Sequence, residues 1–278
     1  MNPQSPPGHL ICEQSPADGE WNMALDAALL ALATQRAESI IRIYRWNAPA
    51  VTLGYFQASN TTPPQQSNPF PGLPVVRRLS GGGAILHHHE WTYSCILPPH
   101  HPARQNPSQL YQTVHLALIE LLGRCNVPCR LRGEPGHPPA TPSKDATAAT
   151  EHFLCFLRGN PNDIVHQSGF KIVGSAQRRR QGAILQHGSI LMRASSHTPD
   201  LPGLLDLSPS CDLQLFEHSL PDTIAGSVAE SWERRTWTDS ELQLADQIQR
   251  QAAIEQSQAS NSSTTRDSST PVNRVSSP

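Results

Sequence analysis

Residues 171–192 constrain the fold of this chain more than any other stretch, and their sequence is KIVGSAQRRRQGAILQHGSILM. Two apolar segments with strand-like composition flank small and then basic residues, so we expect two strands joined by a basic connection. The small residues Gly174, Ser175, Ala176 and Gln177 are predicted to form a turn after the first strand. Lys171 lies on that strand, and the second carries Gln186, His187 and Gly188 at a matching depth. The pattern predicts a hairpin that carries functional polar side chains, and not a hairpin that serves packing alone.

Length and charge exclude several classes of protein. The chain has 278 residues and is 37% hydrophobic, which fits one large domain, alone or with a small appendage. Its formal charge of −2 gives no reason to expect nucleic acid as a partner. It has neither an apolar run long enough to span a bilayer nor an N-terminal secretory signal, so we expect no membrane partner. Six irregularly spaced cysteines favour reduced thiols in the cytoplasm.

Hydrophobic periodicity predicts helices and strands in alternation. The predicted helices are 21–38, 107–124 and 227–254. The predicted strands lie within 40–46, 50–57, 75–98, 127–133, 153–158, 163–177 and 183–192. This order predicts an α+β (α/β) fold, with a mixed, largely antiparallel sheet flanked by helices. Four segments follow: an irregular lead-in at 1–20, a catalytic domain at 21–225, a helical segment at 226–256, and a disordered Ser/Thr-rich tail at 257–278.

A glycine loop follows the strand pattern at 75–78. Its residues are Arg77, Arg78, Leu79, Ser80, Gly81, Gly82, Gly83 and Ala84. Three consecutive glycines allow positive φ and a close approach of the backbone to a ligand, at a high cost in chain entropy for a plain turn. We therefore favour a ligand-binding loop over a simple hairpin turn with solvated arginines. The loop is not a phosphate-binding P-loop, because the Gly-Lys-Ser/Thr ending is absent.

The histidines at 87–89 do not predict a metal site. Neighbouring side chains on a strand point to opposite faces, so at most two of the three converge. No cysteine or carboxylate stands at a usual ligand spacing from them. We expect no metal, and we expect His87 to line a pocket.

Cys155 and Lys171 are the candidate reactive pair. A hairpin can bring the two side chains together across the intervening sixteen residues. A nearby ammonium favours the nucleophilic thiolate. From spacing alone, a nucleophile and a small buried apolar side chain are equally good interpretations of Cys155.

These blocks together resemble the catalytic domain of the biotin- and lipoate-protein ligase superfamily, over roughly residues 20–192. The matching blocks are Asn22-Met-Ala with Asp26, Arg42-Ile-Tyr-Arg-Trp46, Leu53-Gly-Tyr-Phe-Gln57, Arg77-Arg-x-Ser-Gly-Gly-Gly-Ala84, Lys171-Ile-Val-Gly-Ser-Ala-Gln177 and Gly182-Ala-Ile-Leu-Gln-His-Gly-Ser189. The resemblance implies a fold like that of biotin ligases and class II aminoacyl-tRNA synthetases. It also implies acyl chemistry aimed at a lysine of a lipoyl carrier domain.

The order of Cys155 and Lys171 resembles one branch of the superfamily. Octanoyltransferases of that branch carry the cysteine before the lysine, within a Cys-Phe segment, and Cys155-Phe156 matches it. The resemblance implies a Cys155 acyl-enzyme that passes an octanoyl or lipoyl group from a carrier-protein thioester to the acceptor lysine. Lys171 would hold the acyl carbonyl, and backbone N–H groups of 174–176 or of the glycine loop would stabilise the oxyanion.

The resemblance also implies a set of substrate-binding residues and partners. Those residues are Arg77, Arg78, Ser80, Gly81, Gly82, Gly83, Ala84, His87, Gly174, Ser175, Ala176, Gln177, Gln186, His187 and Gly188. The expected donor is acyl carrier protein or another octanoylated carrier. The expected acceptor is a lipoyl-domain protein, either a glycine cleavage carrier protein or a dehydrogenase E2 subunit. Arg77, Arg78 and residues 178–180 are candidates for docking acidic carriers, with solvated charges as the alternative for the last three.

Two other functions stay open at the level of sequence. An ATP-dependent lipoate-protein ligase would use ATP and Mg and would not need Cys155, whereas the transferase requires no cofactor. A non-catalytic relative would bind lipoyl domains and form no acyl adduct. The triple glycine resembles the ligases, because the transferase branch commonly has Gly-Gly-Arg there and Gly83 takes the arginine's place. The acyl donor therefore stays open.

Overall fold

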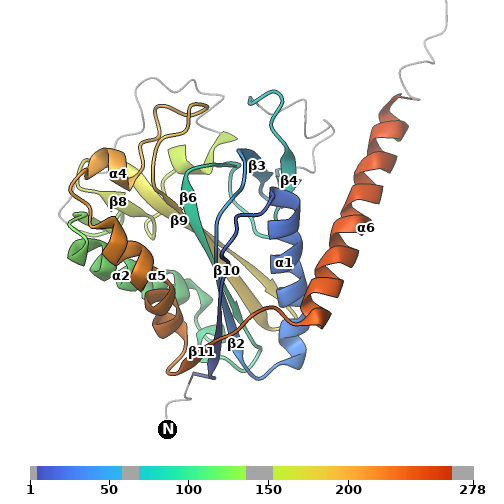
Figure 1. The fold of residues 1–278 in the computed structure, drawn as a ribbon, viewed down its shortest axis with the longest axis horizontal. Helices are drawn as coiled ribbons and strands as arrows, with labels where there is room; N and C mark the ends of the chain where they lie inside the picture. Colours follow the sequence, from blue (N-terminus) through green and yellow to red (C-terminus); the bar gives the residue numbers. More distant parts are fainter. Residues whose placement is uncertain (1–4, 58–68, 136–152, 265–278) are drawn as a thin grey trace, which may run out of the picture.

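The computed structural model describes residues 5–57, 69–135 and 153–264. At its centre is an eight-stranded sheet in the order β11-β1-β2-β6-β10-β9-β8-β7 (Figure 1). Its strands are β1 (Gly8–Cys12), β2 (Ser39–Tyr44), β6 (Glu90–Leu97), β7 (Cys129–Leu131), β8 (Ile164–His166), β9 (Lys171–Arg180), β10 (Ala183–Leu191) and β11 (Trp232–Arg234). The pairs that β1 makes with β11 and β2 are parallel, and all others in this sheet are antiparallel. The predicted α+β fold with a mixed, largely antiparallel sheet is confirmed.

Helices cover both faces of this sheet (Figure 1). They are α1 (Gly19–Leu32), α2 (Pro107–Arg124), α5 (Leu213–Val228) and α6 (Asp239–Thr264). Neighbouring residues of one strand face opposite helices, as the two-residue period of a strand requires. Ile41 packs in the cluster that contains the α2 and α5 side chains, whereas Ile40 packs in the cluster that contains Leu29 and Leu30 of α1. Two apolar layers therefore enclose the strands that carry the site.

The hairpin of β9 and β10 forms at the predicted place, but its turn lies elsewhere. Residues 174–177 are part of β9 and pair with β10, so the predicted small-residue turn is wrong. The chain reverses at Gln181 and Gly182, whose φ values are 49° and 86°. Two consecutive positive φ values match the twist that two-residue hairpin turns need, and glycine adopts them without strain. The small residues instead leave room inside the sheet, because a Cβ on Gly188 would lie 2.4 Å from Ser175 Oγ.

A second sheet of three strands holds the glycine loop. Its order is β4-β3-β5, and its strands are β3 (Ala50–Leu53), β4 (Val75–Arg77) and β5 (Ile85–His87). The predicted strand at 50–57 therefore ends at Leu53. A Cβ on Gly54 would lie 2.0 Å from the carbonyl oxygen of Gly82, so only glycine lets these two loops pack together.

Several predicted elements differ from the structure. Residues 1–20 are not all irregular, because β1 lies within them. The apolar run 153–158 is not a strand, since it contains the 3₁₀ turn η3 (Cys155–Leu157). The predicted helix at 227–254 is β11 followed by α6, which begins at Asp239. Helix α6 also continues through residues 257–264, where disorder was predicted. The structure further contains α5, which the sequence did not predict, together with α4 (Leu204–Leu207), η1 (Ala33–Gln35) and η2 (Pro102–Arg104).

Three predictions fall wholly or partly outside the described residues. They concern most of the proline-rich segment 58–74, most of the loop 134–150, and the tail beyond residue 264. The division into a catalytic domain at 21–225 and a helical segment at 226–256 stays a prediction.

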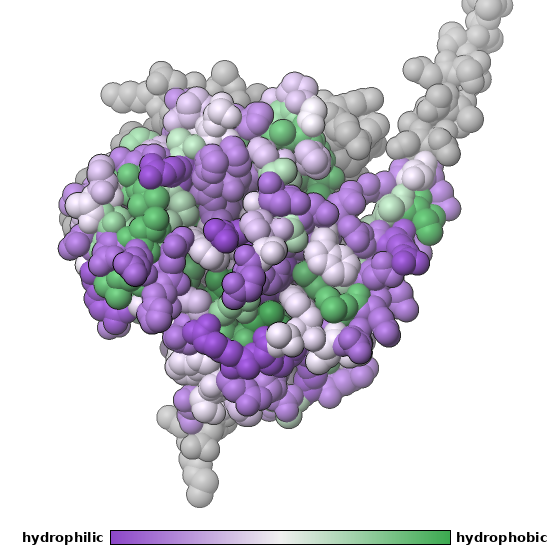
Figure 2. All heavy atoms as spheres, in the orientation of Figure 1, coloured by the Kyte–Doolittle hydropathy of each residue, from purple (hydrophilic) through white to green (hydrophobic). Residues whose placement is uncertain are grey.

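The first turn of helix α6 is anchored by a buried carboxylate. Glu241 is fully buried, and its Oε1 lies 2.5 Å from Nη1 of Arg36 and 2.6 Å from Nη2 of Arg235. Beyond this anchor α6 extends away from the sheet (Figure 1). The side chain of Ile254, on this part of α6, is exposed. The molecular face in this orientation is mostly hydrophilic, with separate small apolar patches (Figure 2).

Candidate active site

The turn that carries Cys155 is joined to the end of the glycine loop. The backbone N–H of Cys155 donates to Ala84 O at 2.7 Å, and the N–H of Ala84 donates to Phe153 O at 2.8 Å. These two bonds place η3 beside the start of β5. A Cβ built on Gly82 would lie 3.9 Å from Cys155 Sγ. The candidate thiol therefore lies directly against the glycine loop.

Lys171 begins β9, and its ammonium lies next to the candidate thiol. The Nζ atom is 3.8 Å from Cys155 Sγ and 3.3 Å from Cys155 O. It also lies 3.0 Å from Oδ1 of Asp163, and both side chains are buried. Burial raises the pKa of Asp163, and Lys171 opposes that rise. Because the ammonium is buried with a counter-ion, it can stabilise a thiolate on Cys155.

A pocket opens between the two sheets at this thiol. It receives Cys155 together with Arg78, His87 and His187. Apolar side chains provide much of the rest of its wall, namely Met23, Tyr44, Trp46, Ile85 and Phe156. Backbone from β9 and β10 completes it at Gly174, Ser175, Ala176, Gly188 and Ser189. Such a pocket, mostly apolar with a few polar groups at one place, suits an apolar chain that ends in a reactive carbonyl.

Arg78 holds the glycine loop in place through hydrogen bonds to its carbonyl oxygens. Its Nη1 donates to the carbonyl and hydroxyl oxygens of Thr52, at 3.1 and 3.0 Å. Its Nη2 donates to the carbonyl oxygens of Gly81 at 2.9 Å and Gly83 at 2.5 Å. Burial lowers the pKa of Arg78 to about 10, which leaves the guanidinium charged at neutral pH. The side chain is only 2% exposed, so Arg78 is not available to a partner's surface and the proposed docking role is wrong for it.

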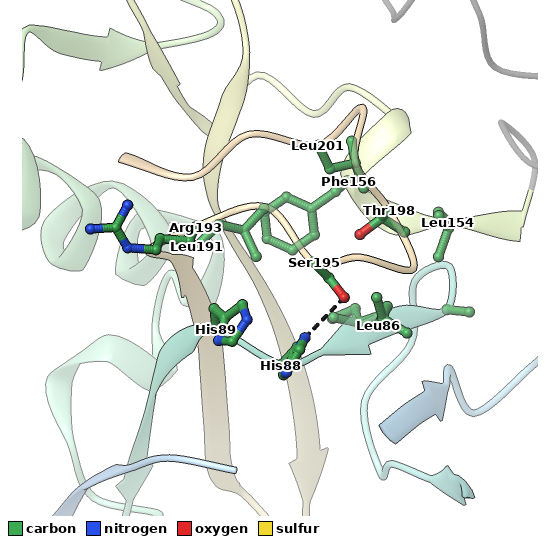
Figure 3. A pocket seen from close by; sticks show the side chains of 12 residues that line it. Leu86, His88, His89, Leu154, Phe156, Leu191, Arg193, Ser195, Thr198 and Leu201 are labelled. Carbon is green, nitrogen blue, oxygen red and sulfur yellow. Dashed lines mark hydrogen bonds between the residues drawn. The ribbon is translucent and has the colours of Figure 1, made fainter. Parts of the chain in front are cut away.

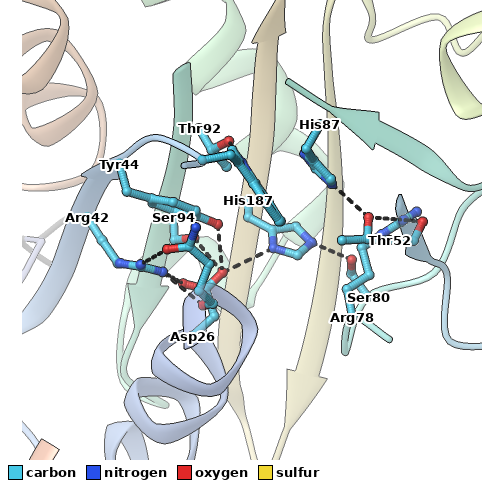
Figure 4. A network of polar contacts seen from close by, with 12 residues as sticks. Asp26, Arg42, Tyr44, Thr52, Arg78, Ser80, His87, Thr92, Ser94 and His187 are labelled. Atoms are coloured by element: carbon cyan, nitrogen blue, oxygen red, sulfur yellow. Dashed lines mark hydrogen bonds and ion pairs between the residues drawn. The ribbon is translucent and has the colours of Figure 1, made fainter. Parts of the chain in front are cut away.

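A buried polar network contacts the glycine loop at Ser80 (Figure 4). His187 lies between Ser80 and Asp26, with Nε2 2.5 Å from Ser80 Oγ and Nδ1 3.2 Å from Asp26 Oδ2. Asp26 also accepts from Arg42 at 2.9 Å and from Ser94 at 2.8 Å. Burial alone would raise the pKa of Asp26, but His187, Arg42 and Ser94 hold it below its ordinary value. The network fixes Ser80, the residue that precedes the three glycines.

His87 is held in one orientation inside the pocket. Its Nε2 lies 2.8 Å from Thr52 Oγ1, and its Nδ1 lies 2.8 Å from Oε1 of Glu90. The ring stacks on Trp46 with centroids 3.7 Å apart. Burial lowers the pKa of His87, although Glu90 opposes this. Both ring nitrogens already have partners, which suits a wall residue better than a proton acceptor.

A second chain of hydrogen bonds lies behind β9. His115 of α2 has Nε2 2.6 Å from Ser175 Oγ, which is 2.7 Å from Tyr93 OH. Gln186 donates to Tyr93 OH at 3.3 Å and accepts from Gln177 at 2.8 Å. Burial lowers the pKa of His115 to about 4. Gln177 and Gln186 therefore support the strands and do not line the pocket.

The structure brings most of the predicted site residues together at the pocket and places a few of them elsewhere. Those brought together at the pocket or the adjoining loop are Cys155, Lys171, Arg78, Gly81, Gly82, Gly83, Ala84, His87, Gly174, Ser175, Ala176, His187 and Gly188. Ser80, Gln177 and Gln186 lie behind the pocket wall, and Arg77 is exposed on β4. Asp163 and His115 were missed. No local pattern marks them, since each acts through a partner on another element.

A second pocket, drawn in Figure 3, shares the lining residues Ile85 and Phe156 with the first. Apolar side chains of Leu86, Leu154 and Leu201 line it, and His88 and His89 lie at one side with their rings 3.6 Å apart. His88 Nδ1 is 2.9 Å from Ser195 Oγ. Within the described ranges, no group of three His, Cys, Asp or Glu side chains is arranged to hold a metal ion. No helix among those residues is long and apolar enough to cross a membrane.

Comparison with known proteins identifies the family. The sequence model of the family described as lipoyl protein ligase A/B catalytic domain matches residues 18–201, about two thirds of the chain. The chain belongs to the lipoyl protein ligase A/B catalytic domain family. The matched region contains Cys155, Lys171 and the glycine loop.

Curated relatives agree with this family. Octanoyltransferase LipM of Macrococcus caseolyticus is 35% identical over 173 residues, which is 62% of this chain and 61% of the relative. Octanoyltransferase LipM of an Exiguobacterium species is 35% identical over 183 residues, 66% of this chain and 64% of the relative. The chain thus spans less than two thirds of the length of these relatives.

The fold matches that of a solved lipoylation system. The structure of a bi-partite lipoate protein ligase and its E2 lipoyl domain from Thermoplasma acidophilum aligns with a TM-score of 0.62 at 17% identity. The alignment covers 89% of this chain and 92% of the other. At this identity the likeness bears on the fold alone.

Proposed function

We propose that this member of the lipoyl protein ligase A/B catalytic domain family is an octanoyltransferase. It moves an octanoyl group from an acyl carrier protein thioester, through an acyl-enzyme on Cys155, to a lysine of a lipoyl-domain protein. The observation that carries the proposal is the distance of 3.8 Å between Cys155 Sγ and Lys171 Nζ, at a pocket with largely apolar walls. The names of the curated relatives support the same reaction.

The covalent step follows from this geometry. The Cys155 thiolate, stabilised by the Lys171 ammonium, attacks the thioester carbonyl and releases the carrier's thiol. The acceptor lysine then attacks the new thioester and forms an amide, which frees Cys155. Dividing the transfer in this way gives two easier steps and ping-pong kinetics. No nucleotide takes part, so the transferase needs neither ATP nor Mg.

The apolar pocket wall supports an acyl chain as the group that is transferred. Met23, Tyr44 and Trp46 line the same pocket as Cys155, and Phe156 follows the cysteine directly. An octanoyl chain in this space transfers apolar surface out of water. The chain would lie with its carbonyl at Cys155 and its methyl end among these rings.

A basic and aromatic surface near the pocket suits an acidic carrier. The Arg178 guanidinium lies 4.5 Å from the centroid of the Tyr55 ring, and the Tyr55 and Phe56 rings meet edge to face at 5.2 Å. Phe56 is 74% exposed, and a Cβ on Gly81 would lie 3.9 Å from its ring. Charge complementarity steers a carrier to this edge, next to the loop that holds Cys155.

Intact-mass spectrometry tests the proposal directly. The protein is incubated with octanoyl-carrier protein without ATP, and an added mass of one octanoyl group on the wild type is expected. Cys155→Ala is expected to give no adduct, and Cys95→Ala is the control because Cys95 is fully buried and its pKa is raised by burial. Octanoylation of a lipoyl domain that requires ATP and free octanoate, and that persists in Cys155→Ala, would show a ligase instead. Binding of a lipoyl domain without any transfer would show a non-catalytic relative.

A further inference from the structure

We propose that Arg78 is a catalytic residue of this acyl transfer, whose Nε–H binds the thioester oxygen as that oxygen gains negative charge. This inference rests on the proposed function and adds a residue that stabilises the transition state. A tetrahedral oxyanion forms when a thiolate attacks a thioester, and donors already in place at that oxygen lower the barrier. The sequence suggested backbone N–H groups and Lys171 for this task, and the geometry points to Arg78.

The first observation is an unused donor at the pocket. Arg78 is 2% exposed, and its two terminal nitrogens donate to Thr52 and to the carbonyls of the glycine loop. Its Nε atom is buried and has no hydrogen-bond partner among the residues that the structure describes. Buried N–H groups are nearly always paired, so an unpaired one on a cation calls for a partner that binds later. Arg78 lines the pocket that also receives Cys155.

The second observation is the position of the guanidinium relative to the thiol. A Cβ on Gly82 would lie 3.1 Å from Arg78 Nη2 and 3.9 Å from Cys155 Sγ. Gly82 therefore lies between the guanidinium and the sulfur, with a φ of 95° and no side chain to separate them. A carbonyl whose carbon is attacked by Sγ can reach the charged group across this glycine. A guanidinium also keeps its charge in a buried site, which suits an oxyanion partner.

The third observation is that Lys171 and the backbone N–H of Ala84 already have partners. An ammonium has three N–H donors. Lys171 Nζ has three neighbouring acceptors, namely Asp163 Oδ1, Cys155 O and Cys155 Sγ. The backbone N–H of Ala84 donates to Phe153 O. Lys171 thus serves the thiolate, and the Arg78 Nε–H is a charged donor that is still unpaired for the oxyanion.

The electron and proton balance is complete without a further reactant. The Cys155 sulfur forms a bond to the acyl carbon, and the carbonyl electron pair moves onto oxygen, where the Arg78 Nε–H holds it. The pair then returns, the bond between the acyl carbon and the carrier sulfur breaks, and that sulfur leaves. The proton that Cys155 gave up ends on the departing sulfur. Arg78 neither gains nor loses a proton.

Two reactions of the same sulfur test the role. Single-turnover octanoylation of Cys155 by octanoyl-carrier protein passes through an oxyanion, whereas alkylation of Cys155 by iodoacetamide does not. Arg78→Lys keeps a cation but loses the planar donors. Its octanoylation rate is expected to fall by about 10²- to 10³-fold, with the alkylation rate within about threefold of the wild type. Arg250→Lys is the matched control, because Arg250 is exposed on α6 and bonds Asp246 there.

A rescue experiment distinguishes the loss of the guanidinium from a loss of structure. Methylguanidinium added to Arg78→Ala is expected to restore part of the octanoylation rate without changing the alkylation rate. An unchanged octanoylation rate in Arg78→Lys, or a parallel fall of both rates in Arg78→Lys and Arg78→Ala without rescue, would overturn the inference. Failure of the wild type to form any octanoyl adduct would instead overturn the proposed function itself.

Discussion

The Nζ atom of Lys171 lies 3.0 Å from Oδ1 of Asp163, and this buried ion pair holds the ammonium 3.8 Å from Cys155 Sγ. Asp163 immediately precedes β8, and Lys171 is the first residue of β9. The antiparallel pairing of these two strands brings the carboxylate and the ammonium together. A counter-ion from the neighbouring strand thus fixes the lysine beside the candidate nucleophile.

Asp163→Asn is expected to lower both stability and reactivity. Removing one partner of a buried ion pair leaves an uncompensated charge and costs about 3–5 kcal/mol of unfolding free energy. Without the carboxylate, Nζ is no longer held in place beside Cys155 Sγ, so Cys155 is expected to react more slowly. Urea unfolding measures the first effect, and the rate of Cys155 alkylation by iodoacetamide at a single pH measures the second. Asp246→Asn, on the exposed face of α6, is the control. An alkylation rate equal to that of the wild type would argue against the role of the pair.

Gly82→Ala and Gly72→Ala form a matched pair of variants. Both glycines have positive φ, 95° and 86°, so alanine costs about 1–2 kcal/mol of backbone strain at either position. A Cβ at Gly72 meets nothing within 4 Å, whereas one at Gly82 lies 3.1 Å from Arg78 Nη2. Gly82→Ala is therefore expected to lower the octanoylation rate by about 10²-fold through a misplaced guanidinium. Gly72→Ala should lose similar stability in thermal unfolding and keep its rate. Equal rates in the two variants would separate Arg78 from catalysis.

The lowered pKa of Glu241 predicts that the free energy of unfolding decreases in acid. Burial alone would raise its pKa, but bonds from Arg235, the Thr238 backbone and Arg36 lower the pKa to about 2. A carboxylate with a lowered pKa stabilises the fold fully above its unfolded value near 4.5, and this contribution is lost as the pH falls from about 4.5 towards 2. The contribution is about 3 kcal/mol at neutral pH. Urea unfolding at several pH values should show Glu241→Gln less stable than the wild type at pH 6, with the difference shrinking as the pH falls. A difference that stays constant with pH would contradict the ion-pair account.

We expect the arginines at the end of β9 to affect the reaction rate only when the acyl donor is a carrier protein. Arg179 and Arg180 are exposed, next to the half-buried Arg178 that stacks on Tyr55. Arg179→Glu with Arg180→Glu is expected to lower kcat/KM for octanoyl-carrier protein by roughly tenfold at low salt, because charge pairs at an interface edge act on association. Octanoyl-pantetheine, which lacks the carrier's acidic surface, should react at the wild-type rate. Loss of activity with both donors would indicate a structural role for the arginines.

Elements whose pattern is local were predictable, and elements that depend on distant partners were not. The α1 and α2 helices and the β9–β10 pair follow from apolar periodicity within one segment. Strands β1 and β11 are short, and they pair with each other over more than two hundred residues of chain, from Gly8 to Trp232. The run 153–158 has the composition of a strand, but it makes only one isolated bridge, between Ala84 and Leu154, and forms η3 instead. Composition cannot reveal whether a partner strand is available.

By itself the sequence determined which residues can react and in what order they occur. Cys155 precedes Lys171, three glycines follow two arginines, and the resemblance of these ordered blocks to a known family implied an acyl-transfer site. Only the tertiary structure decided that Arg78 is buried with an unpaired Nε, and that Ser80 and His187 meet across 107 residues of chain. The physical reason is that burial and pairing depend on which strands lie side by side. That arrangement sets the charge, the donors and the water available to each side chain.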